Sequence, residues 1–512
     1  MMMRFLMAPL RRLVPRAPLL LAATCLLPAS MAFAQTPAAP ESESALIARG
    51  SYLAQAGDCI ACHTAKGGTP FAGGLPIATP LGTIYSTNIT PSQQDGIGRY
   101  TEAQFAAALR EGKRADGAQL YPAMPYTSYA KVSDEDVHAL YTYFMKGVPA
   151  ADHAAPPTAL PFPFNIRLSM AAWNLLFLDG HRFQPDSAKS AEWNRGAYLV
   201  EGLAHCSTCH TPRNALMAEN DKLALAGGTV GTWYAPNITS DAHSGIGGWS
   251  EAEIVSYLKT GVAAGKAQAA GPMAEAIEHS FQHMSDADLR AMAVYLQSVP
   301  AVHDAADTSA PYAWGAPTQQ PDAVRLQPWP DDANKASGAQ LYDANCASCH
   351  QANGQGSADG GLPSLFHNTA LGHARTDNLV MAILQGVSHP SKEAATANGA
   401  SAAAADRLIT TAEAAEQDSK GLLPVDMPAF ADKLSDTQVA TLTNYLMANY
   451  GHPAEPVSAA DVAVLRSGGA PSPLLSLAHW GLGIGIAIVL LVILLCVLIG
   501  VNRGRKRGTP KY

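Results

Sequence analysis

The chain has 512 residues, of which 48% are hydrophobic and 15% charged, and its formal net charge is −8. This composition fits about three or four globular domains, and it excludes a collagen-like or wholly disordered chain. Because both chain ends are basic, the acidic excess lies between them, which argues against nucleic acid or anionic lipid as a partner of that part. An acidic surface fits docking of a basic protein, but it also fits simple solubility.

Residues 1–34 have the pattern of a secretory signal peptide. Four arginines precede an apolar run at 19–27, and residues 32–34 read Ala-Phe-Ala, as at a cleavage site. The run is too short to span about 30 Å of hydrocarbon, so we predict cleavage rather than an N-terminal membrane anchor. The mature chain is then expected in an oxidising compartment.

The pattern Cys-x-x-Cys-His occurs three times, and it accounts for six of the eight cysteines. The other two are Cys25, in the signal segment, and Cys496, in an apolar segment near the C-terminus. The three copies are Cys59, Cys62 and His63; Cys206, Cys209 and His210; and Cys346, Cys349 and His350.

This pattern is typical of covalent haem c attachment, with two thioether bonds from the cysteines and the histidine as an axial iron ligand. A zinc half-site and a thioredoxin-like dithiol are the alternatives to a Cys-x-x-Cys pair. The histidine that follows each pair, and the separation of about 140 residues between neighbouring pairs, favour three covalently bound haem c groups.

The surroundings of the motifs also repeat. Gly50-Ser51-Tyr52-Leu53 precedes the first motif and Gly196-Ala197-Tyr198-Leu199 the second, and the third has Gly338-Ala339-Gln340-Leu341. An Asn-Ile-Thr stretch follows at 88–90 and at 237–239 in the first two copies only. The repeats indicate one duplicated ancestral unit, with the third copy more divergent.

A methionine beside a proline recurs at similar places, on what we expect to be a loop before the last helix of each unit. Met124, Met273 and Met427 follow their motif histidines by 61, 63 and 77 residues, and Asn88 to Met124 and Asn237 to Met273 both span 36. We predict them as the second axial ligands, in preference to Met284, Met381 and Met447, which have no counterparts in the other units. Irons with histidine and methionine ligands carry electrons and leave no site open for a substrate.

Each unit is predicted to end in a helix that starts at a serine: Ser133, Ser285 and Ser435. Apolar residues follow at offsets 4, 7 and 11, and a tyrosine follows at offset 10, which we interpret as a packing residue. Residues 164–178 in the first linker are apolar but too short to cross a membrane, so they pack on a neighbouring domain or dock a partner subunit. Residues 391–418 are Ala-rich and are predicted as an inserted surface loop or loose helix.

An uncharged apolar segment at 480–501 is long enough to cross a bilayer, and a basic tail follows it. We predict a transmembrane helix rather than a buried core helix, with the tail in the cytoplasm and the body of the chain outside it. The predicted boundaries are 1–34 for the signal peptide, 43–150 for domain 1, 151–190 for a linker, 191–300 for domain 2, 301–332 for a linker, 333–452 for domain 3, 480–501 for the transmembrane helix and 502–512 for the basic tail.

The three motifs, the Asn-Ile-Thr stretches, the two Gly-Ile-Gly segments at 96–98 and 245–247 and the Gly-Pro-Met-Ala at 271–274 resemble the cytochrome c subunit of bacterial membrane-bound dehydrogenases. The dehydrogenases to which such subunits belong act on alcohols, aldehydes and sugars. The resemblance covers roughly residues 45–450. It implies a mainly α fold of three tandem class I cytochrome c domains plus one C-terminal transmembrane helix.

The resemblance further implies an electron-transfer subunit on the periplasmic side of the inner membrane. Its partners would be a large dehydrogenase subunit that holds PQQ, FAD or a molybdenum cofactor, a small subunit, and ubiquinone, with domain 3 as the natural exit toward the membrane. No catalytic residue is expected in this chain. The alternatives are a cytochrome c subunit of a terminal oxidase, or a multihaem peroxidase-like enzyme, which would need an open or displaceable iron ligand.

Overall fold

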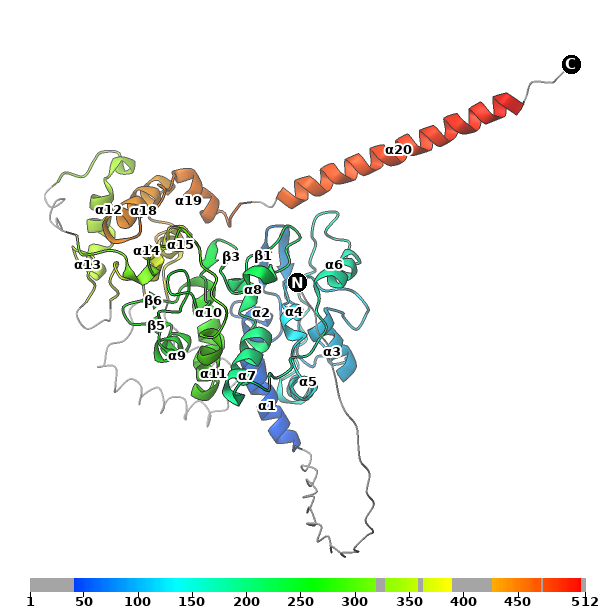
Figure 1. The fold of residues 1–512 in the computed structure, drawn as a ribbon, viewed down its shortest axis with the longest axis horizontal. Coiled ribbons are helices and arrows are strands. Elements are labelled where there is room, and N and C mark those ends of the chain that lie inside the picture. The colour runs from blue at the N-terminus through cyan, green and yellow to red at the C-terminus, as the bar shows by residue number, and fades with distance from the viewer. Residues whose placement is uncertain (1–40, 319–326, 358–361, 389–425, 471–472, 508–512) are drawn as a thin grey trace, which may run out of the picture. The chain divides into compact units, whose positions relative to one another are not determined.

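The computed structural model describes residues 41–318, 327–357, 362–388, 426–470 and 473–507, and Figure 1 shows these as coloured ribbon. The predicted signal peptide, the 391–418 insertion and the last residues of the basic tail lie outside the described residues. All contacts described below lie within residues 42–512, which form one unit.

Helices dominate the described residues, and each domain begins and ends with a helix. Domain 1 and the following linker contain α1 (Glu43–Ala56), α2 (Cys59–His63), β1 (Pro76–Thr79), β2 (Gly82–Tyr85), α3 (Glu102–Glu111), α4 (Tyr126–Tyr129), α5 (Asp134–Thr142), the π-helical turn η1 (Tyr143–Gly147) and α6 (Ser169–Phe177).

Domain 2 repeats this order with additional short elements. They are α7 (Ala191–Tyr198), η2 (Leu199–Leu203), α8 (Ser207–His210), η3 (Asp221–Leu223), β3 (Gly228–Val230), β4 (Trp233–Ala235), α9 (Glu251–Thr260), β5 (Val262–Ala263), β6 (Ala267–Gln268), α10 (Gly271–His279), η4 (Phe281–His283) and α11 (Asp286–Leu296). The strands pair as three antiparallel hairpins, β1 with β2, β3 with β4 and β5 with β6. Trp233 stands opposite Val230 in the second hairpin.

In domain 3 and its flanks, the named elements of the described residues are all helices. They contain η5 (Pro311–Ala313), η6 (Ala333–Lys335), α12 (Gly338–Asn345), α13 (Ala347–His350), α14 (Thr369–Gly372), α15 (Asp377–Gln385), α18 (Asp436–Tyr450), α19 (Ala459–Arg466) and α20 (Pro473–Arg507).

The first and last helices of each domain cross at the glycine that the repeats share; Figure 1 shows the pairs α1 with α5 and α7 with α11. A Cβ atom on Gly50 would lie 2.1 Å from the Ala139 carbonyl oxygen, and one on Gly196 would lie 1.9 Å from that of Ala291. A Cβ atom on Gly338 would lie 2.3 Å from Cβ of Tyr445. Only glycine therefore allows the two helices to approach so closely.

The last helices begin where the sequence predicts. Ser133, Ser285 and Ser435 are their N-cap residues, and each hydroxyl accepts a hydrogen bond from the backbone N–H three residues later. The tyrosines at offset 10, Tyr143 and Tyr295 among them, lie against the crossing glycines.

The buried apolar residues of domains 1 and 2 form one continuous core, whereas domain 3 has a core of its own. Phe105, Leu140 and Leu203 belong to the first core, and Leu341 and Leu442 to the second. Domains 1 and 2 therefore bury apolar surface against each other, which stabilises the pair as one body.

Two matching sets of polar contacts join domains 1 and 2. The Tyr52 hydroxyl of domain 1 donates to the Asp288 carboxylate of domain 2 at 2.6 Å. The Tyr198 hydroxyl of domain 2 donates to the Asp136 carboxylate of domain 1. These are equivalent residues of the two repeats, so the junction has the reciprocal form of a twofold interface.

Each aspartate of this junction is also bound by an arginine of its own domain. Arg195 donates from Nε and Nη2 to the two oxygens of Asp288, both at 2.8 Å, and Arg49 Nε donates to Asp136 at 3.0 Å. Burial would raise the pKa of Asp288, but the hydrogen bonds from Arg195 and Tyr52 outweigh it and hold the pKa below its usual value.

Helix α20 contains an apolar stretch, Leu474–Ile499, and it is the one helix of the described residues that is long and apolar enough to cross a membrane. It begins before Trp480 and continues into the basic segment. In the linker, α6 lies against domain 1 through Trp173, whose ring meets Tyr126, and Asn174, which accepts from the Tyr126 hydroxyl at 2.7 Å. Leu175 and Leu176 of α6 are exposed.

Candidate functional site

Each Cys-x-x-Cys-His motif forms a single helical turn. In domain 2 the His210 N–H donates to the Cys206 carbonyl at 2.9 Å, and in domain 3 the His350 N–H donates to the Cys346 carbonyl at 2.9 Å. One such turn brings the two cysteines, three residues apart, and the following histidine to one side of the helix. The chain enters the first two turns through a left-handed residue, Asp58 with φ 50° and His205 with φ 38°.

The three motif histidines are held in the same way. Nδ1 of His63 donates to the Thr87 carbonyl at 2.6 Å, Nδ1 of His210 to Pro236 at 2.6 Å, and Nδ1 of His350 to Pro363 at 2.9 Å. A carbonyl oxygen can only accept, so the proton of the neutral ring lies on Nδ1 and the lone pair on Nε2. Nε2 is therefore the nitrogen that each ring presents to a metal.

The Asn-Ile-Thr stretches fix the carbonyls that hold two of these rings. The Asn237 side-chain oxygen accepts from the Thr239 N–H at 2.8 Å, and its Nδ2 donates to the Val302 carbonyl at 2.7 Å. Asn88 makes the same contacts with Thr90 and with the Ala151 carbonyl. The sequence marked these stretches as shared, but not as the segments that orient the histidines. The signal was the position of Thr87 and Pro236 directly before the shared asparagines.

The three predicted methionines occupy different backbone settings. Met124 lies in a turn, where its carbonyl accepts from the Tyr126 N–H at 2.8 Å. Met427 forms a two-way bridge with Val387, with N–O distances of 2.9 and 3.0 Å. The expected loop position is wrong for Met273, which lies in the first turn of α10. Pro272 before it fits this turn because the first helical N–H groups have no partner within the helix.

A cavity of about 430 Å³ joins the motifs of domains 2 and 3. Its lining includes both motifs and their methionines: Cys206, Cys209, His210 and Met273 from domain 2, and Cys346, Cys349, His350 and Met427 from domain 3. The competing methionines Met284, Met381 and Met447 are buried in the apolar cores instead. In domain 1, Met124 is partly buried against the shared core.

Burial sets the protonation of the groups in these turns. It raises the pKa of the Cys59, Cys206 and Cys346 thiols to about 12 and so keeps them neutral. It lowers the pKa of His63 and His210, although the hydrogen bonds to the carbonyls oppose this shift. The rings are therefore neutral at pH 7, as a metal ligand must be.

These features fit a covalently attached haem. Each turn offers two thiols and one imidazole nitrogen, and in domains 2 and 3 a methionine lines the same apolar space. Histidine and methionine are the axial ligands of iron in electron-transfer cytochromes.

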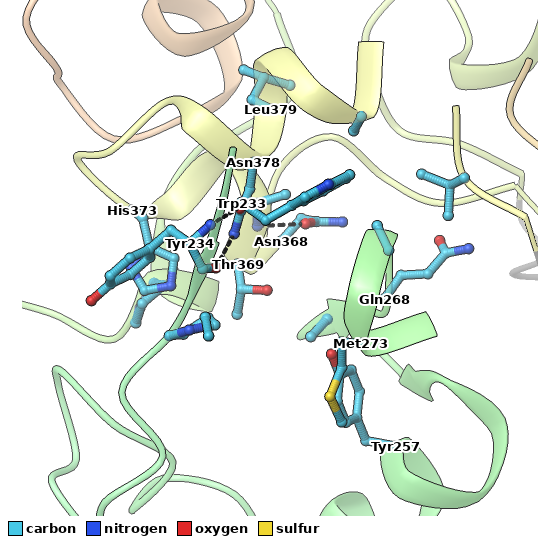
Figure 2. Close-up of a pocket in the computed structure, with 18 of the residues that line it drawn as sticks. Trp233, Tyr234, Tyr257, Gln268, Met273, Asn368, Thr369, His373, Asn378 and Leu379 are labelled. Atoms are coloured by element: carbon cyan, nitrogen blue, oxygen red, sulfur yellow. Dashed lines mark hydrogen bonds between the residues drawn. The ribbon is translucent and has the colours of Figure 1, made fainter. Parts of the chain in front are cut away.

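Beside this cavity domains 2 and 3 are joined by a backbone hydrogen bond from the Thr369 N–H to the Lys266 carbonyl, at 2.8 Å, and by the side chain of Asn378, which sequence reasoning missed. The Tyr234 N–H of strand β4 donates to the Asn378 side-chain oxygen of α15 at 2.8 Å, and Asn378 Nδ2 donates to the Tyr234 carbonyl at 2.8 Å (Figure 2). The Arg375 guanidinium lies 4.5 Å above the Tyr234 ring, and the His373 ring meets the edge of the same tyrosine. A single asparagine on a helix has no pattern that would mark it in the sequence.

A family model described as cytochrome c matches the chain three times, at residues 47–147, 194–300 and 336–449. The fructose dehydrogenase cytochrome subunit of Gluconobacter japonicus is 44% identical over 457 residues, with 87% of each chain covered. The gluconate 2-dehydrogenase cytochrome c subunit of Pantoea cypripedii is 40% identical, over 83% of this chain and 90% of that one. The cytochrome c subunit of the quinone alcohol dehydrogenase of Gluconobacter oxydans is 37% identical, with 86% of each chain covered.

Proposed function

Because this chain belongs to the cytochrome c family, as a three-domain member alongside the cytochrome c subunits of fructose, gluconate and alcohol dehydrogenases, we propose that it is the electron-transfer subunit of a membrane-bound dehydrogenase complex. It accepts electrons from a large catalytic subunit that holds PQQ, FAD or a molybdenum cofactor, with a small subunit as a possible third component. It passes them through three haems to ubiquinone.

The residues that hold the haems follow from the repeated turns. The thioether bonds are assigned to Cys59 and Cys62, Cys206 and Cys209, and Cys346 and Cys349. The axial ligands are assigned to His63 with Met124, His210 with Met273, and His350 with Met427. Each haem supplies a one-electron couple when bound. The chain's own residues hold the rings, exclude water and keep the imidazoles neutral and oriented.

The observation that carries the proposal is the shared cavity of domains 2 and 3, which two complete sets of cysteine, histidine and methionine line together. Two redox groups that are held in one apolar space exchange electrons without crossing water. Methionine as the second axial ligand would occupy the remaining coordination position of the iron, so these sites favour electron transfer over peroxidase-like chemistry.

Helix α20 places the chain in the membrane in this proposal. Its apolar stretch would anchor the protein to the inner membrane, with the basic tail on the cytoplasmic side and the three domains in the periplasm. Domain 3 precedes this helix in the chain, so it is the natural exit toward ubiquinone.

The proposal is tested by purifying the full chain from membranes through a C-terminal tag. We expect a large dehydrogenase subunit to copurify and the complex to reduce a soluble ubiquinone analogue when its substrate is added. Recovery of this chain alone, or a complex with an oxygen-reducing subunit, would contradict the proposal. A pyridine haemochrome assay on the same sample should return three haems per chain.

A further inference from the structure

We propose that Trp233 is a positioning residue that couples the second and third haem sites across the junction of domains 2 and 3. This inference rests on the proposed function. It adds that one side chain of domain 2 sets the surroundings of both Met273 and Met427. A change of that side chain therefore alters the haem sites of domains 2 and 3, while the haem site of domain 1 is unaffected.

Trp233 belongs to domain 2 by its backbone, and its side chain also packs against domain 3. It lies on strand β4, and its side chain packs against the separate apolar core of domain 3, which Met427 also contacts. Figure 2 shows it between the helix that carries Asn378 and Leu379 and the segment that carries Met273. It lines the cavity together with Met273 and Met427.

The Trp233 ring is also pressed against the segment that presents Met273. Gly271 has a φ of 53°, and a Cβ atom there would lie 2.3 Å from Cε2 of the indole. Gly271 begins α10, two residues before Met273, so the indole plane fixes where this helix starts. Because glycine has no Cβ atom and readily adopts a positive φ, the indole ring can lie directly against the first residue of α10.

The Asn378 side chain holds the strand in place from the other domain. Its two hydrogen bonds to the Tyr234 backbone, both 2.8 Å, act like one rung of a sheet between β4 and α15. Because Tyr234 directly follows Trp233, this clamp fixes the depth to which the indole enters the cavity.

The corresponding strand of domain 1 shows that this residue is specific to the second junction. In the sequence, Gly82-Thr83-Ile84-Tyr85 corresponds to Gly231-Thr232-Trp233-Tyr234, so Ile84 stands in the place of Trp233, although the hairpin turn lies at 80–81 in domain 1 and at 231–232 in domain 2. Ile84 is therefore the matched control position.

Haems held at these two sites would exchange one electron, so that one iron would be oxidised as the other is reduced. No bond is made or broken and no proton is transferred. Trp233 takes no charge in this step; it keeps water out of the space between the two sites and holds the methionine segments at fixed positions.

The test is a redox titration of the full-length holoprotein, as wild type, Trp233→Ala, Trp233→Phe, Asn378→Ala and Ile84→Ala. The three potentials are assigned by separate Met124→Leu, Met273→Leu and Met427→Leu variants. For Trp233→Ala we expect the second and third potentials to shift together by a three- to tenfold change in the one-electron equilibrium constant, about 30–60 mV. Trp233→Phe should keep both potentials close to their wild-type values. Asn378→Ala should reproduce part of the shift seen in Trp233→Ala, and Ile84→Ala should leave both potentials unchanged.

A shift at the second haem alone, or no shift in Trp233→Ala or Asn378→Ala, would overturn the inference. If Trp233→Ala does not accumulate with three haems, the decision rests on Asn378→Ala and Trp233→Phe, which keep the aromatic packing. Failure of the proposed function is distinguishable, because it would appear in the wild type as fewer than three haems or as an iron without methionine ligation.

Discussion

The junction between domains 1 and 2 has reciprocal, buried polar contacts, whereas domains 2 and 3 together line a cavity at their junction. At the first, Tyr52 and Tyr198 exchange equivalent hydrogen bonds with Asp288 and Asp136. At the second, the Asn378 side chain binds the Tyr234 backbone of strand β4, and the Thr369 N–H donates to the Lys266 carbonyl at 2.8 Å. The difference shows how one duplicated unit came to make two kinds of contact.

The sequence of domain 3 explains why it does not join the reciprocal pair. Gln340 stands where domains 1 and 2 have the donor tyrosine, and Gln438 stands where they have the acceptor aspartate. Both glutamines instead accept from their own N-cap backbone, Gln340 from the Ser337 N–H at 3.0 Å and Gln438 from the Ser435 N–H at 2.9 Å. The side chains complete local capping boxes rather than reach another domain.

The largest expected effect is at the first junction. Asp288→Ala leaves Arg195 and Tyr52 without their buried acceptor, so we expect a loss of about 3 kcal/mol in the free energy of unfolding. Asp136→Ala should cost a similar amount because it is the equivalent residue. Gln438→Ala is the matched control in domain 3, where loss of one side of a cap costs about 1 kcal/mol. Denaturant unfolding of the haem-loaded chain measures all three, and equal losses at the three positions would remove the distinction between the junctions.

Asn378→Ala is expected to cost about 2 kcal/mol, because two neutral hydrogen bonds are lost at the second junction. The effect should be confined to domains 2 and 3. Hydrogen exchange followed by mass spectrometry should show faster exchange in β4 and α15, and an unchanged exchange rate in α1 and α5. Faster exchange in α1 would mean that the two junctions are not independent.

Tyr52→Phe and Tyr198→Phe each remove one hydroxyl and keep the ring, so we expect about 1 kcal/mol from each. Because the two contacts are equivalent, their effects on the unfolding midpoint should be alike. If only one of the two variants lost stability, the two contacts would not contribute equally, although their geometry is equivalent.

The two junctions should also differ in their response to acid. The pKa of Asp288 is below its usual 3.8, so its contribution is complete above that pH and is lost as pH falls through the lowered pKa. Burial lowers the pKa of His373 from 6.5 to about 4, so between these values the unfolded chain binds a proton that the folded chain does not. Stability therefore falls as pH drops from 6.5 to 4.

We expect His373→Gln to flatten the pH dependence of the melting temperature between about pH 6.5 and 4, and Asp288→Asn to flatten it below 3.8. This is the smallest of the predicted effects, since each variant changes the uptake of at most one proton. Identical pH profiles for both variants and the wild type would argue against these assignments.

The fold was largely predictable because its determinants are local and repeated. The crossing glycines, the N-cap serines and the apolar stripes occur in all three units, and repetition distinguishes them from chance. The fold class and the three covalently bound haem c groups agree with the three cytochrome c domain matches. The position of Met273 within a helix differs from the expectation that each proline-flanked methionine lies on a loop, because proline also begins helices.

The contacts between domains were not predictable from the sequence. Tyr52 and Tyr198 were recognised as repeated residues, but their partners lie more than 200 and about 60 residues away, and nothing local marks an aspartate in a cap as an acceptor for another domain. Trp233 and Asn378 do not recur in the other units, so comparison of the repeats could not find them. Periodicity describes elements, and it carries little information about which surfaces meet.

The central claim is that three haems are each held by one histidine and one methionine of this chain. Near-infrared magnetic circular dichroism of the purified, oxidised holoprotein tests it most directly, because the position of the ligand-to-iron band depends on the axial pair. We predict histidine–methionine signals that account for all three haems. A bis-histidine band or a high-spin, five-coordinate component at any haem would contradict the account.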